Sequence, residues 1–223
     1  MAGSIIEVGA GIQGYLALPS SGHGSAVIVI QEWWGIVPHV KDVVERFASE
    51  GFVALAVDHY RGRATTEPDE AKKLMLGLRI AEVAADMALG ADFLAGRDDV
   101  SGTAISVVGF CMGGGLALLA PTVSERITKA SAFYPAMPWP DYAPDWSRYA
   151  GKEAIIHKAA SDEASAGPAI AEYVTAIAGH GGSVEVFEYP ESKHAFFNDA
   201  RPEVYDARYA ATAWERTLAF FRS

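Results

Sequence analysis

The single cysteine of the chain, Cys111, lies in a glycine-rich turn that could make it a nucleophile. The turn reads Gly109-Phe110-Cys111-Met112-Gly113, a G-x-C-x-G pattern. In a nucleophile elbow, glycines two residues to either side permit a tight strand-to-helix turn that lifts the nucleophile above the sheet. The helix N-terminus then favours a thiolate and, later, an oxyanion. The competing interpretation is a small buried cysteine in a glycine-rich helix start.

A hydrolytic cysteine needs a histidine base and a carboxylate that orients this base. In hydrolases that carry a nucleophile elbow, the order along the chain is nucleophile, acid, histidine. Asp162 lies in the loop after the strand-like run 153–159, and His194 lies in the loop after the run 183–190. We therefore predict that Cys111, Asp162 and His194 form a catalytic triad.

Both partners of the cysteine have alternatives in the sequence. Glu163 could replace its neighbour Asp162. His59 stands at the end of another strand-like run and is the main competitor of His194. His157 lies inside a strand-like run, so we expect it in the core or behind the site rather than at the reacting atoms.

The stretch VIVIQEWWG (27–35) places another acidic group at the end of a buried run, followed by two tryptophans. The backbone N–H of Trp33 could complete an oxyanion hole with that of Met112. A carboxylate at Glu32 beside a thiol either raises the cost of ionising the thiol or accepts its proton. Alternatively, Glu32 is a strand-end charge that reaches water, and Trp33 and Trp34 form an apolar lid.

The elements that must position these residues alternate between strand and helix patterns. Strand-like runs occupy 15–19, 25–31, 52–58, 104–110, 129–135, 153–159 and 183–190. Helical patterns occupy 39–51, 68–95, 112–123, 167–180 and 203–222. Such alternation predicts an α/β fold with a mostly parallel sheet covered on both faces. Right-handed crossovers then place the site at the carboxyl ends of the strands.

Composition excludes several function classes. The net charge of −10 and the lack of a basic cluster argue against nucleic acid and anionic membrane surfaces as partners. No apolar run is long enough to span a bilayer, and the N-terminal stretch lacks the pattern of a signal peptide. A lone cysteine is expected to be a free thiol in a reducing compartment. We expect a cytoplasmic protein that is a monomer or a small homo-oligomer.

Five segments, read together, resemble the dienelactone hydrolase (carboxymethylenebutenolidase) family of the α/β-hydrolase fold. They are VIVIQEWWG, VDHYRGR, VVGFCMGG, YPESKHAF and AWERTLAFF. The resemblance covers nearly the whole chain and implies one α/β-hydrolase domain over residues 1–223. It also implies a hydrolase without cofactor or metal whose small-molecule substrate is a lactone or ester, such as an enol-lactone converted to maleylacetate in chloroaromatic breakdown.

The resemblance assigns a role to each site residue. Cys111 is the nucleophile, His194 the base and acid, and Asp162 the residue that orients it. Glu32 is the activator: the thiol rests neutral against it, and substrate binding moves the glutamate, which then takes the proton. Tyr134 matches a family tyrosine near the site.

The sequence departs from the family pattern where a substrate carboxylate would bind. Family members hold this carboxylate with two arginines, one of them shortly after the catalytic histidine. Here the first arginine after His194 is Arg201. Other basic candidates are Arg61, Arg63, Lys72, Lys73 and Arg79. Trp34 and Phe197 suggest a more apolar substrate pocket, with Arg61 as a further substrate contact.

Two other functions compete with hydrolysis. One is a non-catalytic small-molecule-binding protein of the same fold. The other is a thiol redox sensor, which the absence of a second cysteine to resolve a sulfenic acid disfavours.

Overall fold

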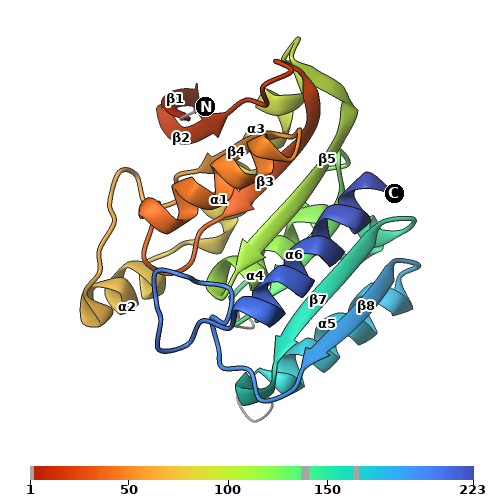
Figure 1. Ribbon diagram of the computed structural model, residues 1–223. Coiled ribbons are helices and arrows are strands. Elements are labelled where there is room, and N and C mark those ends of the chain that lie inside the picture. Colours follow the sequence, from red (N-terminus) through yellow and green to blue (C-terminus); the bar gives the residue numbers. More distant parts are fainter. Residues whose placement is uncertain (1–2, 137–140, 163–165) are drawn as a thin grey trace.

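The computed structural model describes residues 3–136, 141–162 and 166–223, which form one eight-stranded sheet with helices on both faces (Figure 1). The strand order is β1-β2-β4-β3-β5-β6-β7-β8. β1 and β2 join antiparallel, and the strands from β3 to β8 are parallel to one another. The strands are β1 (Ser4–Gly9), β2 (Ile12–Ala17), β3 (Gly24–Ile30), β4 (Val53–Val57), β5 (Val100–Phe110), β6 (Ile127–Phe133), β7 (Glu153–Ala159) and β8 (Ser183–Tyr189). This architecture confirms the predicted α/β-hydrolase fold.

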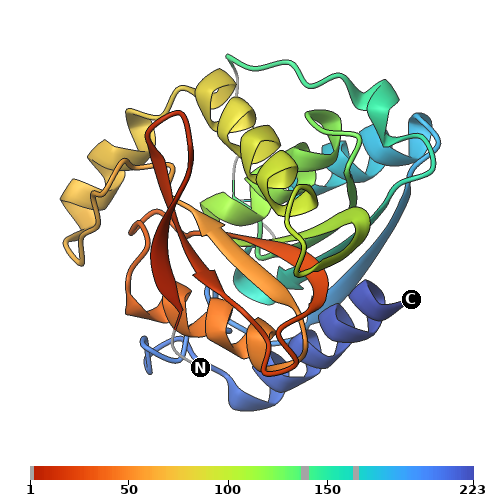
Figure 2. The same ribbon diagram turned by 90° about the horizontal axis from the view of Figure 1, so that it is seen from above.

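The helices divide between the two faces of the sheet. They are α1 (Pro38–Ser49), α2 (Pro68–Leu76), α3 (Ile80–Ala95), α4 (Met112–Leu119), α5 (Gly167–Gly179) and α6 (Ala207–Arg222). Figure 2 shows α1 and α6 on one face and α3 and α5 on the other. Each face encloses its own apolar core, because successive side chains of a strand point to opposite faces. None of the helices in the described part of the chain is long and apolar enough to cross a membrane.

The register of the parallel strands brings their carboxyl ends to one edge. Ile30 pairs with Gly109, Phe110 with Phe133, and Ala159 with Tyr189. The residues that follow these ends therefore emerge side by side, although they are up to about 160 positions apart in sequence. This edge is where the sequence predicted the site.

The segment 68–95 is not one long helix, as predicted, but two. α2 ends at Leu76 with Gly77 as its cap, and α3 starts at Ile80 after Arg79, which has an extended backbone (φ −97°, ψ 106°). Glycine loses the most backbone entropy in a helix and commonly marks its end. The segment is rich in Ala, Leu and Met, which favour a helix, so the sequence predicted no break.

Two further differences concern the ends of the chain. β1 was not predicted from the sequence. It is an edge strand that pairs only with β2, and several of its side chains are exposed. An edge strand does not need the continuous apolar run by which central strands are recognised. The last helix starts at Ala207 rather than 203, because the Asp206 carboxylate accepts a hydrogen bond from the Tyr209 N–H and caps the helix there.

Candidate active site

Cys111 occupies a strained turn between β5 and α4. Its backbone has φ 55° and ψ −118°, a region that side chains other than glycine rarely adopt. The flanking glycines are required by close backbone contacts. A Cβ on Gly109 would lie 1.9 Å from the Gly113 carbonyl oxygen, and one on Gly113 would lie 2.4 Å from that of Gln31. The turn therefore has the physical features of a nucleophile elbow.

The first turn of α4 lies against the end of β3. The Cys111 carbonyl accepts hydrogen bonds from the N–H groups of Gly114 (2.9 Å) and Gly115 (3.3 Å). Met112 is the first helical residue, so its N–H has no acceptor within the helix. The contact between Gly113 and the Gln31 carbonyl brings this helix start next to the loop that begins with Glu32 and Trp33. The two N–H groups predicted for the oxyanion hole thus belong to adjoining segments.

His194 and Asp162 form a hydrogen-bonded pair beside the thiol. His194 Nδ1 lies 2.9 Å from both carboxylate oxygens of Asp162, and the His194 N–H donates to Ser161 Oγ at 2.7 Å. The Asp162 side chain is buried and the His194 side chain is partly exposed. Burial lowers the pKa of His194, but its hydrogen bonds to Asp162 and Cys111 outweigh this effect and raise the pKa to about 10. The protonated imidazole is therefore stabilised between a carboxylate and the sulfur.

Glu32 is a buried carboxylate at the same edge, which disagrees with the alternative that it reaches water. It is 2% exposed, and its Oε2 accepts a 2.7 Å hydrogen bond from Asn198 Nδ2. Within the described residues, Oε1 has no hydrogen-bond partner. Burial raises the pKa of Glu32, and the nearby charges of His39, His194 and Arg201 oppose this rise. Such a group holds a proton more readily than an exposed glutamate does.

Tyr134 lies between Glu32 and the histidine. Its ring centroid is 5.1 Å from that of His194, and its backbone has φ 36°. The hydroxyl is buried close to the Glu32 carboxylate, without a hydrogen bond of ordinary geometry to any described residue. Burial, followed by the Glu32 charge, raises the pKa of Tyr134 well above its usual value, so this phenol is neutral. A buried, neutral hydroxyl can donate a hydrogen bond to a ligand.

A cleft of about 340 Å³ lies on the Asn198 side of Glu32. Its lining is mostly apolar, with a single arginine: Trp34, Val37, Pro38, His39, Thr65, Thr66, Asn198, Ala200 and Arg201. The rings of Trp33 and Trp34 meet edge to face at 4.9 Å. Trp34 lines this cleft, and its role as a substrate contact stays a prediction.

Two expected substrate contacts have other surroundings. The Arg61 guanidinium donates to both oxygens of Asp86, at 2.7 and 3.0 Å, and is held by this ion pair. The Phe197 ring is 2% exposed and packs in the core against Phe110 (centroids 5.2 Å apart) and Phe133 (5.0 Å). An aromatic ring gains more from such packing than from a place at a solvated loop.

The alternatives to His194 and Asp162 have other surroundings or lie outside the described residues. His59 lies 3.4 Å from Asp86 and belongs to the Arg61 cluster. His157 is fully buried and contacts Tyr189 Oη (2.7 Å), which confirms that it is a core residue. Glu163 lies outside the described residues.

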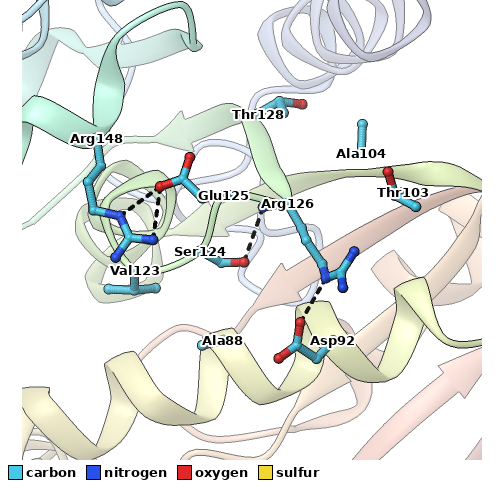
Figure 3. Close-up of a pocket in the computed structure, with 10 residues that line it drawn as sticks. All are labelled: Ala88, Asp92, Thr103, Ala104, Val123, Ser124, Glu125, Arg126, Thr128 and Arg148. Carbon is cyan, nitrogen blue, oxygen red and sulfur yellow. Dashed lines mark hydrogen bonds and ion pairs between the residues drawn. The ribbon is translucent and has the colours of Figure 1, made fainter.

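A second hollow, of about 500 Å³, lies at the opposite edge of the sheet (Figure 3). Its two arginines are paired, Arg126 with Asp92 at 2.8 Å and Arg148 with Glu125 at 2.9 Å. The residues that line it include no cysteine or histidine. Over the described residues, no cluster of three His, Cys, Asp or Glu side chains that could hold a metal ion is found.

Two residues of the site were missed by the sequence prediction. Asn198 holds Glu32, and His39 lines the cleft with it. Asn198 stands four residues after His194, which was its only signal. His39 is the first residue of the predicted helical segment 39–51, and nothing in the sequence singled it out.

The chain is similar to several known proteins. Residues 12–223 match the profile described as "Dienelactone hydrolase family". "Protein usf" of Aquifex pyrophilus is 34% identical over 96% of this chain and 94% of its own. The "Putative carboxymethylenebutenolidase" of Aquifex aeolicus is 30% identical, with the same coverage. The crystal structure of a "Putative Dienelactone Hydrolase" from Klebsiella pneumoniae superposes with a TM-score of 0.82 at 26% identity and covers 95% of this chain and 93% of its own.

Proposed function

The chain belongs to the dienelactone hydrolase family and is a carboxylic ester or lactone hydrolase, and we propose that it works through Cys111 and a thioester acyl-enzyme. The family makes the chain an enzyme rather than the non-catalytic binding protein that the sequence left open. The observation that carries the proposal is Cys111 on a strained elbow, beside a His194 ring that Asp162 holds at 2.9 Å.

In the proposed reaction, the Cys111 thiolate attacks the substrate carbonyl carbon. The resulting oxyanion accepts hydrogen bonds from the N–H groups of Met112 and Trp33. His194, held by Asp162, gives a proton to the departing oxygen as the carbonyl reforms and leaves a thioester. His194 then takes a proton from water, whose oxygen attacks the thioester; the acid and the Cys111 thiolate are released, and His194 is protonated again.

Glu32 is proposed to control the thiol proton. Its pKa is raised by burial, so it exchanges a proton more readily than an exposed glutamate does. The neutral Tyr134 hydroxyl beside it can donate to either the carboxylate or the substrate. This arrangement supports a thiol that stays protonated until substrate enters and Glu32 accepts its proton.

The substrate class follows from the cleft. The apolar walls around Trp34 favour a neutral or weakly polar acyl group, while Arg201 is the one cation in the lining. Arg201 is 37% exposed and pairs with Glu203 at 3.0 Å. A substrate carboxylate, as in dienelactone, would compete with Glu203 for this guanidinium. We therefore propose small esters as substrates, together with enol-lactones of the dienelactone type.

The test is hydrolysis of p-nitrophenyl acetate and of dienelactone by the wild-type and variant proteins. Cys111→Ala should lose at least 10³-fold in kcat/KM for both, because no other nucleophile stands on the elbow. Full activity in Cys111→Ala would refute the proposal. Arg201→Gln should lower kcat/KM about 10-fold for dienelactone only. Arg126→Gln, at the opposite edge and with similar exposure, is the matched control.

A further inference from the structure

A second histidine–carboxylate pair lies behind Glu32, on the α1 side of the cleft. His39 Nδ1 is 3.1 Å from Asp199 Oδ1, and the His39 side chain is 3% exposed. Arg46, about two turns further along α1, forms an ion pair with the second Asp199 oxygen. Because Asp199 is held as a carboxylate, His39 Nδ1 can donate a hydrogen bond to it, which leaves Nε2 as the ring nitrogen without a partner among the described residues.

Two consecutive residues tie this pair to Glu32. Asn198 donates to Glu32 Oε2 at 2.7 Å, and the next residue, Asp199, contacts His39. Asn198 is itself fixed, because its Oδ1 accepts from the Ala200 N–H at 3.1 Å. One short stretch after His194 therefore sets the positions of both the glutamate and the second histidine.

Each of the two groups has one open polar atom. Glu32 Oε1 and His39 Nε2 are both buried, and neither has a hydrogen-bond partner among the residues that the structure describes. Buried polar groups are nearly always satisfied. The open atom of His39, which lines the cleft, and that of Glu32, which Asn198 holds, therefore point to a shared proton or a bridging water. His39 and Asn198 both line this cleft, which gives water access to the pair.

The charged surroundings of Glu32 favour His39 as its partner. His39 reaches it from α1, His194 and Arg201 from the segment after β8, and the Tyr134 hydroxyl from the end of β6. Among these groups, His39 offers a buried ring nitrogen, Nε2, that has no partner in the described part of the chain. His194 is already engaged with Asp162, and Arg201 with Glu203.

We propose that His39, held by Asp199, is a positioning residue that takes the thiol proton on from Glu32 and so returns Glu32 to its ionised form. This inference rests on the proposed function. When Glu32 has taken the proton from Cys111, its carboxyl O–H passes the proton to His39 Nε2, directly or through one water in the cleft. Glu32 is then a carboxylate again, His39 is a cation, and Asp199 keeps its negative charge. The cleft lets the proton leave to solvent.

The test is the pH dependence of kcat/KM for p-nitrophenyl acetate between pH 5 and 9. In His39→Gln, Glu32 loses the group that takes its proton and should stay protonated to higher pH. We expect the acidic limb to move up by about one pH unit, with roughly 10-fold lower kcat/KM on that limb and near wild-type values at high pH. His59→Gln is the matched control, because His59 is also buried, bonded to an aspartate and open at Nε2. Its acidic limb should not move.

A double-mutant cycle separates positioning from a merely structural effect. If His39 acts through Glu32, His39→Gln should change kcat/KM less than 2-fold in a Glu32→Gln background. Additive losses, or an unmoved acidic limb in a folded His39→Gln protein, would overturn the inference. Asp199→Asn carries the same test if His39→Gln does not fold. Activity that survives Cys111→Ala would instead refute the proposed function, so the two failures are distinguishable.

Discussion

The contact between α4 and β3 makes Gly113→Ala the sharpest test of the elbow. A Cβ on Gly113 would lie 2.4 Å from the Gln31 oxygen, 2.5 Å from the Ile30 oxygen and 2.9 Å from the Ile30 carbonyl carbon. All three are backbone atoms at the end of a central strand and cannot rotate away. Ordinary contact begins at 3.4 Å, so the helix start must move by about 1 Å (3.4 minus 2.4). The peptide that carries the Met112 N–H moves with it.

The magnitudes differ for stability and for activity. Forcing one extra methyl group into a filled site costs about 1–3 kcal/mol. The better helix propensity of alanine returns up to about 1 kcal/mol. We therefore expect the free energy of unfolding to fall by about 1–2 kcal/mol. A displacement of about 1 Å at a catalytic group costs on the order of 10²-fold in rate, so kcat/KM should fall further than stability does.

The assay combines urea unfolding with kcat/KM for p-nitrophenyl acetate. Gly179→Ala is the control, because Gly179 is the last residue of α5 and no atom lies within 4 Å of its added Cβ. This control should keep wild-type kcat/KM and change stability by no more than about 1 kcal/mol. A Gly113→Ala protein that is less stable but fully active would refute the reasoning, because the contact would then not set the geometry of the oxyanion donors.

Two further predictions concern histidines. Asp162→Asn should lower kcat for p-nitrophenyl acetate by about 10²-fold or more without unfolding the protein, since a neutral amide does not stabilise protonated His194 as a carboxylate does. Unchanged kcat would remove Asp162 from the triad. Burial, followed by the Arg216 charge, lowers the pKa of His157 to about 3. Between pH 6.5 and 3, the unfolded chain therefore binds a proton that the folded chain does not. As a result, the free energy of unfolding falls as the pH falls through this range. His157→Gln should shrink the loss of unfolding free energy between pH 7 and 4.5 by about 2–3 kcal/mol, measured by urea titration at both pH values, and an unchanged loss would contradict the burial argument.

The strands could be predicted because their causes are local. Runs such as SAVIVIQ and FVALAVD are apolar and rich in β-branched residues, as strands buried on both faces must be, and β3 and β4 lie within one residue of the predicted bounds. The break at Gly77 was missed because the surrounding residues favour a helix, and one glycine does not reveal whether the chain turns there. Exposed β1 carried no apolar run and depends on pairing with β2.

The sequence by itself determined the residue types of the candidate triad, their chain order and the edge at which they meet. It could do so because an elbow depends on spacings of two residues, and parallel strands all end at one edge. Only the tertiary structure decided what surrounds each group: Glu32 buried and held by Asn198, Arg61 turned to Asp86, and Phe197 enclosed in the core. These surroundings come from contacts between segments far apart in the chain, such as Glu32 with Asn198, and burial changes the pKa of a carboxylate in a way that local sequence does not record.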